Sequence, residues 1–410
     1  MKRRLAAALL RARLARFPAA ALLGPRQCGK TTLGRSLSKH YYDAEQPGDR
    51  VRLDLDWPGI AAGRKLVVID EAQSWPELFP RLRAAIDADR RRNGRFLLLG
   101  SVSPMLMREV SESLAGRLAR VELTPFLLPE VGSRVLDRLW LTGGFPDGGV
   151  LGAKVFPSWQ RDYLAWMAQR DLPAWGLAAR PQVTDRLLHM LAAVHGQAWN
   201  ASALGQSLGL SYHTVNSHLD FLEGAYLVRR LAPWSGNLRK RLTRSPKVYV
   251  RDTGLLHALL RAGSRAELVR HPAAGASWEG FVIEQLLGSL AASGVDANPH
   301  YLRTSDGHEI DLLLSLGGTT VAIEVKLSAG AAPQDLARLE RAADLVSAQH
   351  RYIVCRTAAP VASKTRGVLD LAAAIARLLA LSGPRGRKRQ SGLAPGTSPR
   401  AGAQGEKKPA

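Results

Sequence analysis

The chain has 410 residues, a length typical of two to four domains rather than one. Hydrophobic residues make up 46% and charged residues 22%, as in a globular protein, and no run of 18 apolar residues is free of charge, which excludes a membrane-spanning helix. The only cysteines, Cys28 and Cys355, exclude a disulfide framework, so we expect a reducing, cytoplasmic setting.

The formal net charge of +22 is concentrated in three segments. Residues 1–16 carry six basic and no acidic side chains, and the tail from Leu381 carries seven basic side chains and one glutamate. Residues 228–251 carry eight basic and no acidic side chains within a segment whose pattern is that of a folded region. A basic patch on a folded surface predicts contact with DNA, and a solubilising surface is the alternative.

The first residues predict a basic helix and not a targeting segment, because Arg11, Arg13 and Arg16 interrupt the apolar run. A buried strand over Ala19–Leu23, the loop GPRQCGKT and a helix over Thr31–Lys39 follow. This order is the context in which G-x-x-x-x-G-K-[ST] cradles phosphates, so ATP and Mg²⁺ are the expected cofactors. The residues expected to contact the nucleotide are Gly24, Pro25, Arg26, Gln27, Cys28, Gly29, Lys30, Thr31 and Thr32.

Within this loop, Lys30 is expected to lie on the β- and γ-phosphates and Thr31 to ligate Mg²⁺. The run KLVVIDEAQ predicts a buried strand that ends at Asp70, which would join the Mg²⁺ shell, while Glu71 would polarise the attacking water. A second buried strand, RFLLLG, ends at Ser101, a candidate sensor of the γ-phosphate or a plain turn residue. Arg117 could reach a phosphate in its own chain or in a neighbouring subunit, and a surface salt bridge is the alternative.

The phrases LLGPRQCGKTTL, LVVIDEAQ, LLLGS and ESLAGR, in this order, resemble a prokaryotic family of AAA-type ATPases whose C-terminal domain is DUF4143. GGFP, SPKVYVRDTGLLHALL, WEGFVIEQLL and IEVKLS match later blocks of the same family, so the resemblance runs from about residue 14 to 375. It implies a phosphate-sensing role for Arg117. Because relatives of the family form rings, it also allows a homo-oligomer.

Residues 136–183 predict a helical lid, and residues 201–231 predict two helices around a turn at Gly209-Leu210, the second capped by Ser211. The second helix would place Val215, Leu219 and Leu222 on its buried face. With the strands YLVRR and KVYVR as a wing, this is the layout of a winged helix-turn-helix, which contacts either DNA or a protein.

The last folded segment predicts three strands with turns at SDG and LGG, preceded by a helix that carries Glu284. Glu284, Asp311 and the pair Glu324 and Lys326 match a restriction-endonuclease-like core, in which the two strand carboxylates hold Mg²⁺ and the lysine activates water. Three alternatives stay open: an active nuclease, a scaffold that has lost its chemistry, or a plain surface pair of Glu324 and Lys326. Glu279 and Glu309 are the substitute acids, and no zinc site is expected.

We therefore expect an α/β protein with a parallel P-loop NTPase sheet over residues 1–135, the lid over 136–183 and the winged helix over 184–255. A small restriction-endonuclease-like domain over 256–381 and a disordered basic tail over 382–410 would follow. The expected function is an Mg²⁺-dependent ATPase coupled to DNA. The alternative is an ATP-dependent switch that acts on a protein partner.

Overall fold

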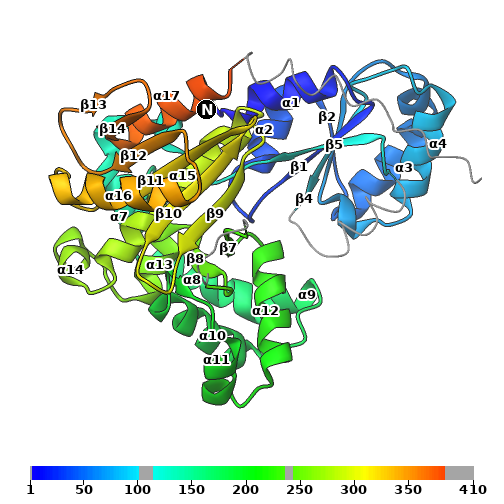
Figure 1. Cartoon of the computed structure of the whole chain (residues 1–410). Helices are drawn as coiled ribbons and strands as arrows, with labels where there is room; N and C mark the ends of the chain where they lie inside the picture. Colours follow the sequence, from blue (N-terminus) through cyan, green and yellow to red (C-terminus); the bar gives the residue numbers. More distant parts are fainter. Residues whose placement is uncertain (1, 101–113, 236–242, 384–410) are drawn as a thin grey trace, which may run out of the picture.

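The structure, a computed structural model, describes residues 2–100, 114–235 and 243–383. It contains a five-stranded sheet, a nine-stranded sheet and a group of helices that lies below both sheets in the view of Figure 1. None of the described helices combines the length and the apolar character that crossing a bilayer requires.

The five-stranded sheet has the order β2-β3-β4-β1-β5, and all its pairs are parallel. Its strands are β1 (Ala19–Leu23), β2 (His40–Asp43), β3 (Val67–Asp70), β4 (Phe96–Gly100) and β5 (Leu118–Glu122). Leu23 at the end of β1 lies opposite Gly100 on one side and Glu122 on the other. The carboxyl ends of these strands therefore share one edge, where open α/β sheets bind ligands.

Helices cover both faces of this sheet, because each buried strand is apolar on both sides. Ala20 and Leu22 pack in one cluster with α1 and α2, and Ala21 packs in another with α4. The elements are α1 (Ala6–Leu14), α2 (Lys30–Leu37), α3 (Pro47–Ala62), η1 (Ala72–Ser74) and α4 (Leu78–Ala88).

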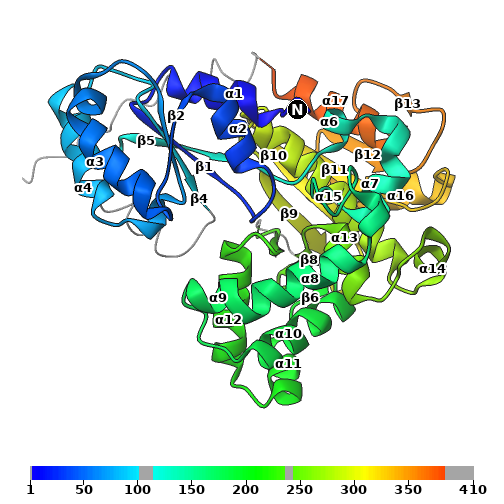
Figure 2. The ribbon, with the colours of Figure 1, turned by 180° about the vertical axis from the view of Figure 1, so that it is seen from behind.

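A helical region follows β5 and contains a second apolar cluster that joins its helices to β7 and β8. Its first elements are α6 (Leu128–Val131), η2 (Ser133–Val135), α7 (Leu136–Thr142), η3 (Ala153–Val155), α8 (Ser158–Trp166), the π-helix η4 (Met167–Asp171), α9 (Leu172–Ala174) and α10 (Pro181–Ala193). Its later elements are α11 (Ala201–Leu208), α12 (Tyr212–Gly224), α13 (Thr253–Leu259) and α14 (Arg265–Arg270). Figure 2 shows α9, α10, α11 and α12 gathered in one lobe.

The nine-stranded sheet has the order β13-β14-β12-β11-β10-β9-β7-β8-β6 and mixes parallel with antiparallel pairs. Its strands are β6 (Gln197–Ala198), β7 (Val228–Pro233), β8 (Lys247–Val250), β9 (Asn298–Arg303), β10 (Glu309–Leu316), β11 (Thr319–Val325), β12 (His350–Val354), β13 (Val361–Ala362) and β14 (Arg366–Leu369). Helices α15 (Ala274–Ala292) and α17 (Leu371–Leu381) pack on one face, and α16 (Pro333–Leu345) packs on the other.

This sheet crosses the boundary predicted at residues 255 and 256, because β7 pairs in parallel with β9 through Ala232 and His300. The strands of the predicted wing and those of the predicted last domain are thus one sheet. The described residues confirm the α/β class and the parallel first sheet.

Candidate functional site

The loop between β1 and α2 is shaped so that two of its positions exclude side chains. A Cβ added to Gly24 would lie 2.1 Å from the carbonyl oxygen of Leu123, and Gly29 has a φ of +100°, a left-handed conformation that favours glycine. Gly29 is also the N-cap of α2, and no side chain caps this helix. Its first N–H groups are therefore left for an anion, which is an arrangement that fits phosphate.

Lys30 begins α2 and lies inside the loop, with only 5% of the residue exposed. Its Nζ donates to the carbonyl oxygens of Gly24, at 3.1 Å, and Pro25, at 2.9 Å. The ammonium thus lies against the loop that the sequence predicts to hold the phosphates.

Thr31 and Asp70, the two predicted Mg²⁺ ligands, are brought together by the parallel sheet. The hydroxyl of Thr31 donates to Oδ2 of Asp70 at 2.6 Å, and Asp70 is only 3% exposed at the end of β3. The hydroxyl of Tyr41 donates to the same oxygen at 2.7 Å. A hydroxyl and a carboxylate side by side are the hard oxygen ligands that Mg²⁺ takes beside phosphates, so the site fits the cofactors that the sequence predicts.

Tyr41 was not identified from the sequence, although it shares Asp70 with Thr31. Its burial and its hydrogen bond to Asp70 raise the pKa of Tyr41 above the ordinary value, so the phenol stays a donor. Tyr41 lies on the short edge strand β2. The sequence around it carries no motif that predicts a contact with Asp70.

Glu71, the predicted activator of water, follows Asp70 in a left-handed backbone conformation, with a φ of +44°. This conformation is uncommon for a residue with a side chain and concentrates at functional sites. The amide of Gln73 donates to Oε2 of Glu71 and orients the carboxylate. Burial and the nearby charge of Glu71 raise the pKa of Glu45, so a third acid lies close to this edge of the sheet.

Arg26 projects from the glycine loop toward the helical region. Its Nη1 lies 2.5 Å from Oδ1 of Asp171 in η4, and Nε of Arg170 lies 2.9 Å from the same oxygen. Asp171 is 4% exposed, and the ion pair joins residues 145 positions apart. The loop that would hold the phosphates is therefore linked directly to the predicted lid.

Arg4 is a second residue that the sequence did not single out, and it fixes the other side of the loop. Its Nη1 donates to the carbonyl oxygen of Cys28 at 2.8 Å, and its Nε lies 3.1 Å from Oε1 of Glu130. Cys28 is fully buried, and burial raises the pKa of its thiol, so it is inert. The remaining loop positions, Gln27 and Thr32, are exposed.

Arg117 does not lie at this site within its own chain, which corrects one alternative for its role. It precedes β5, and its carbonyl accepts from the N–H of Ala19, at the start of β1. The glycine loop follows the far end of β1, about 17 Å away along the strand. Nε and Nη2 of Arg117 instead bind Asp87 at 2.8 and 2.9 Å. Ser101, the other predicted sensor, lies outside the described residues.

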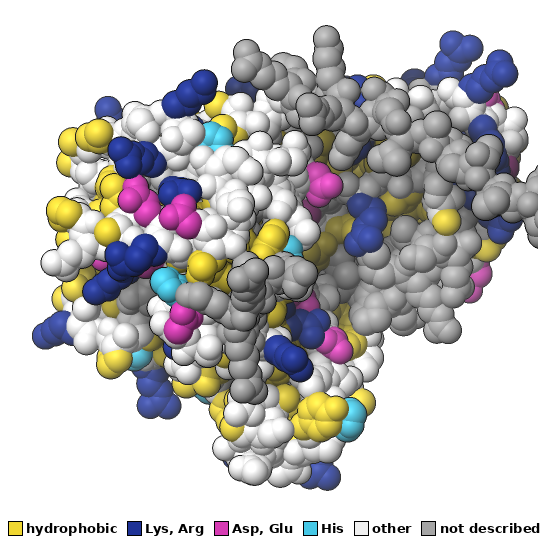
Figure 3. Space-filling model, in the orientation of Figure 1, with side chains coloured by type: hydrophobic (Ala, Val, Ile, Leu, Met, Phe, Trp, Pro, Cys, Tyr) yellow, Lys and Arg dark blue, Asp and Glu magenta, His cyan; other side chains and the backbone are white. Residues whose placement is uncertain are grey.

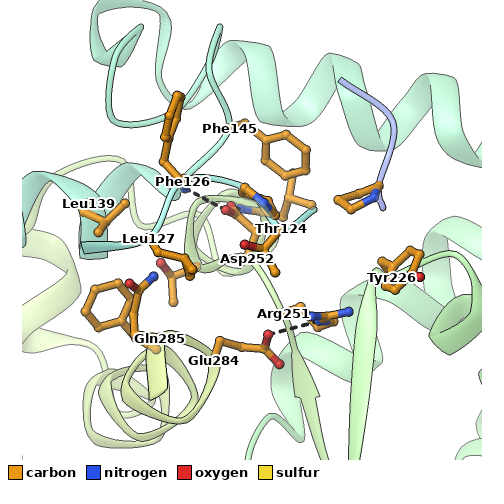
Figure 4. A pocket seen from close by; sticks show the side chains of 16 residues that line it. Thr124, Phe126, Leu127, Leu139, Phe145, Tyr226, Arg251, Asp252, Glu284 and Gln285 are labelled. Atoms are coloured by element: carbon orange, nitrogen blue, oxygen red, sulfur yellow. Dashed lines mark hydrogen bonds and ion pairs between the residues drawn. The ribbon is translucent and has the colours of Figure 1, made fainter. Parts of the chain in front are cut away.

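A pocket of about 40 Å³ lies at the junction of the loop, the segment after β5, the end of β8 and α15 (Figure 4). Arg251 faces into it and binds Glu284 through Nε at 3.0 Å and Glu122, the last residue of β5, through Nη2 at 2.6 Å. Asp252 also lines it and accepts from the N–H of Gly144 at 2.8 Å. Burial raises the pKa of Asp252 to about 6.

Glu284 does not join the other predicted nuclease residues, and this corrects its place as the helix glutamate of that constellation. It is buried between Arg229 and Arg251, and its two ion pairs hold its pKa below the ordinary value against the effect of burial. Glu279, one turn and a half earlier on α15, lies near Asp311 instead: both contact Lys247 Nζ, at 3.0 and 3.7 Å. The predicted substitute acid therefore occupies this position.

Glu324 and Lys326, the last two predicted nuclease residues, form an ion pair at 2.6 Å. Burial and the charges of Glu279 and Glu324 raise the pKa of Asp311 well above the ordinary value. Within residues 2–100, 114–235 and 243–383, no group of three or more His, Cys, Asp or Glu side chains is arranged to hold a metal ion.

The basic segment 228–251 is largely neutralised within the described residues. Arg229 and Arg251 bind Glu284, Arg230 binds Asp220 and Glu223, and Lys247 binds Glu279. Figure 3 shows Lys and Arg side chains scattered among other side chains on the visible face and not gathered in one patch. Most of the described charge in this segment therefore holds the fold together.

The two predicted helices and the turn between them are present. Gly209 ends α11 in the left-handed conformation, and Ser211 caps α12 by accepting from the N–H of Thr214 at 3.1 Å. Val215, Leu219 and Leu222 are buried as predicted. Tyr212 and His213 are exposed at the start of α12.

Three family models match successive parts of the chain: an AAA domain over residues 16–132, a domain of unknown function (DUF8612) over 133–266, and a domain of unknown function (DUF4143) over 274–373. Uncharacterized proteins of Mycobacterium bovis and Mycobacterium tuberculosis are each 43% identical over 331 residues, 80% of this chain and 74% of the relative. A protein of Haemophilus influenzae is 23% identical over 48% of this chain and 53% of its own.

Among solved structures, a Walker-type ATPase of Pyrococcus abyssi is similar at 16% identity and a TM-score of 0.41, over 62% of this chain and 94% of that one. A RuvB variant of Thermotoga maritima is similar at 18% identity and a TM-score of 0.26, over 55% of this chain and 87% of that one. At these scores neither likeness extends to the whole fold.

Proposed function

The chain belongs to the prokaryotic AAA-type ATPases with a DUF4143 C-terminus, and on that premise we propose that it binds ATP with Mg²⁺ at residues 24–31 and hydrolyses the γ-phosphate. The observation that supports this most strongly is the 2.6 Å contact between Thr31 and Asp70 beside the buried Lys30. Thr31 lies in the first turn of α2 and Asp70 lies at the end of β3, 39 positions later in the sequence.

Each residue has a role that follows from its position. Lys30 neutralises the β- and γ-phosphates, and the N–H groups at the start of α2 bind phosphate oxygens. Thr31 and Asp70 hold Mg²⁺, which when bound supplies charge neutralisation at the γ-phosphate. Glu71, oriented by Gln73, accepts a hydrogen bond from the attacking water and aligns it with the phosphorus.

The test is ATP turnover of the purified chain and of Lys30→Ala. Loss of the ammonium removes the charge that faces the phosphates, so turnover should fall to background. Lys65→Ala is the matched control, because Lys65 is exposed just before β3. Equal turnover in Lys30→Ala and Lys65→Ala would refute the assignment.

The nucleotide is proposed to control the helical region and the second sheet through two ion-pair links. Arg26 joins the glycine loop to Asp171 in η4, and Glu122 joins the end of β5 to Arg251 at the end of β8. Both links begin within the shared edge of the first sheet, where charge changes when ATP is bound or cleaved. A phosphate that attracts Arg26 would weaken its pair with Asp171 and free η4 to shift.

Two kinds of partner could respond to this shift of the helical region: DNA and another protein. Helices α11 and α12 with β7 and β8 support a winged helix, and the exposed Tyr212 and His213 lie where such helices meet the major groove. The internal pairing of Arg229, Arg230 and Lys247 favours the other candidate, a protein partner. Stimulation of turnover by DNA at physiological salt, lost in Tyr212→Ala/His213→Ala, would support DNA, and unchanged turnover with every form of DNA would exclude it.

The second sheet with α15 and α16 is proposed to be a restriction-endonuclease-like scaffold. A helix on each face and strands β10 and β11 with Asp311 and Glu324 support this assignment. We do not extend it to nuclease activity, because Glu284 is engaged elsewhere.

A further inference from the structure

Three acids, Glu279 of α15 and Glu309 and Asp311 of β10, lie around the side chain of one lysine. Lys247 comes from β8, and its side chain is only 4% exposed. Its Nζ lies 3.0 Å from Oε1 of Glu279, 3.0 Å from Oε1 of Glu309 and 3.7 Å from Oδ1 of Asp311. One ammonium thus lies at the point where three acids meet.

Further contacts hold Glu279, Asp311 and the ammonium in place. The hydroxyl of Tyr249 donates to Oε1 of Glu279 at 2.5 Å, and the N–H of Val325 donates to Oδ2 of Asp311 at 2.9 Å. The ring of the buried Tyr301 lies 5.5 Å from the ammonium. Lys247 and Asp311 are therefore buried, Glu279 is largely buried, and Glu309 closes the cluster on its exposed side.

The charge balance of the cluster requires a cation. Burial alone would lower the pKa of Lys247, but Glu279, Asp311 and Glu309 outweigh this effect and raise it. Lys247 therefore stays protonated at neutral pH. Glu324, at the neighbouring position on β11, is satisfied separately by Lys326.

An ammonium in this position differs from a metal ion in its chemistry. It supplies positive charge and N–H donors, two of which reach Glu279 and Glu309, but it has no open coordination position and does not lower the pKa of a bound water. A metal ion would need the same carboxylate oxygens, at about 2.0 to 2.6 Å. The two occupants exclude each other.

We propose that Lys247 is the resident cation of this cluster: it forms ion pairs with Glu279 and Glu309 beside Asp311, fastens β8 to α15 and β10, and closes the cluster to divalent metal ions. This inference does not depend on the proposed ATPase activity, and it makes the second sheet a scaffold in which an internal ion pair network stands where a metal-dependent hydrolase would hold its metal.

The test uses Mn²⁺ alone, measured by electron paramagnetic resonance, on the full chain carrying Thr31→Ala and Asp70→Asn so that the ATP site does not contribute. With Lys247 intact, no Mn²⁺ should bind at this cluster. Adding Lys247→Ala should create one Mn²⁺ site per chain, and adding Glu279→Gln to that variant should remove it. Lys364→Ala, at an exposed position, is the matched control and should create none.

Two results would overturn the proposal. One is Mn²⁺ binding to the chain with Lys247 intact that disappears in Asp311→Asn. The other is a folded Lys247→Ala variant, judged by circular dichroism, that binds no Mn²⁺. Should Lys247→Ala fail to fold, the comparison of the intact chain with Asp311→Asn still decides: Mn²⁺ binding lost in Asp311→Asn overturns the proposal, and its absence in both supports it.

Discussion

Arg26 of the glycine loop and Asp171 of η4 form an ion pair of 2.5 Å across 145 residues of sequence. The guanidinium of Arg26, a residue predicted to bind phosphate, is therefore held by an acid of the helical region. In the proposed coupling, ATP and Asp171 compete for this positive charge.

Asp171→Asn should therefore tighten the binding of ATP. Without the negative charge of Asp171, Arg26 is free to turn toward the phosphates, and an ion pair of this exposure corresponds to a factor of about 2 to 5 in Kd. Isothermal titration of ATP into both proteins measures the change. Asp185→Asn, an exposed acid on α10, should leave Kd unchanged, and equal affinities in all three proteins would contradict the competition.

Glu71→Gln should separate binding from hydrolysis. The amide keeps the size of the side chain but not its ability to accept a proton or strongly orient water, so kcat should fall by about 10² to 10⁴ while ATP still binds. Single-turnover kinetics and nucleotide titration report the two effects. Glu77→Gln, at the exposed N-cap of α4, serves as the control, and a Glu71→Gln variant with the kcat of this control would disprove the role.

Arg117→Ala tests the position of this arginine just before β5, at the edge of the sheet opposite the glycine loop. Because Arg117 binds Asp87 and not the glycine loop, the substitution should leave the Kd for ATP unchanged. A fall in turnover that grows with protein concentration would place Arg117 in a neighbouring subunit's site. Weaker ATP binding by the monomeric protein would contradict the geometry.

The carboxyl of Asp252 should make stability depend on pH. Burial raises its pKa to about 6, above that of an unfolded aspartate, so its protonation favours the folded state. The contribution is fully present below pH of about 4 and is lost as pH rises through about 6, and a shift of this size corresponds to about 2 to 3 kcal/mol.

The difference in free energy of unfolding between the protein and Asp252→Asn isolates this group. It should change in favour of the unsubstituted protein as pH is lowered from about 7 to about 4, whereas a difference that is flat over this range would show that the carboxyl titrates normally. Urea unfolding at a series of pH values gives the measurement.

Local sequence was sufficient for much of the phosphate site. The strands β1 and β3 and the helix α2 each follow from a short apolar run or a glycine loop, and parallel pairing then brings Thr31 and Asp70 together. Arg4 and Asp171 could not be found in this way. Arg4 pairs with Glu130 and Asp171 pairs with Arg26, each more than a hundred residues away along the chain, and no local pattern encodes such contacts.

The second sheet shows a different reason for failure. Helix α15 is buried on almost all sides, so its apolar pattern does not say which of its two glutamates faces β10. Glu279 and Glu284 lie about 140° apart around the helix, which sends one to Lys247 and the other to Arg251. The burial of Lys247 could not be predicted either. It belongs to a basic segment of the kind that usually lies on the surface.

The central claim is that the contact between Thr31 and Asp70 marks the magnesium position of an ATP site. The most direct measurement is the Kd for ATP with and without Mg²⁺, by isothermal titration, in the unsubstituted protein and in Asp70→Asn. We predict that Mg²⁺ tightens ATP binding in the unsubstituted protein and has little effect in Asp70→Asn. An equal gain from Mg²⁺ in both proteins, or no ATP binding in either, would contradict the account.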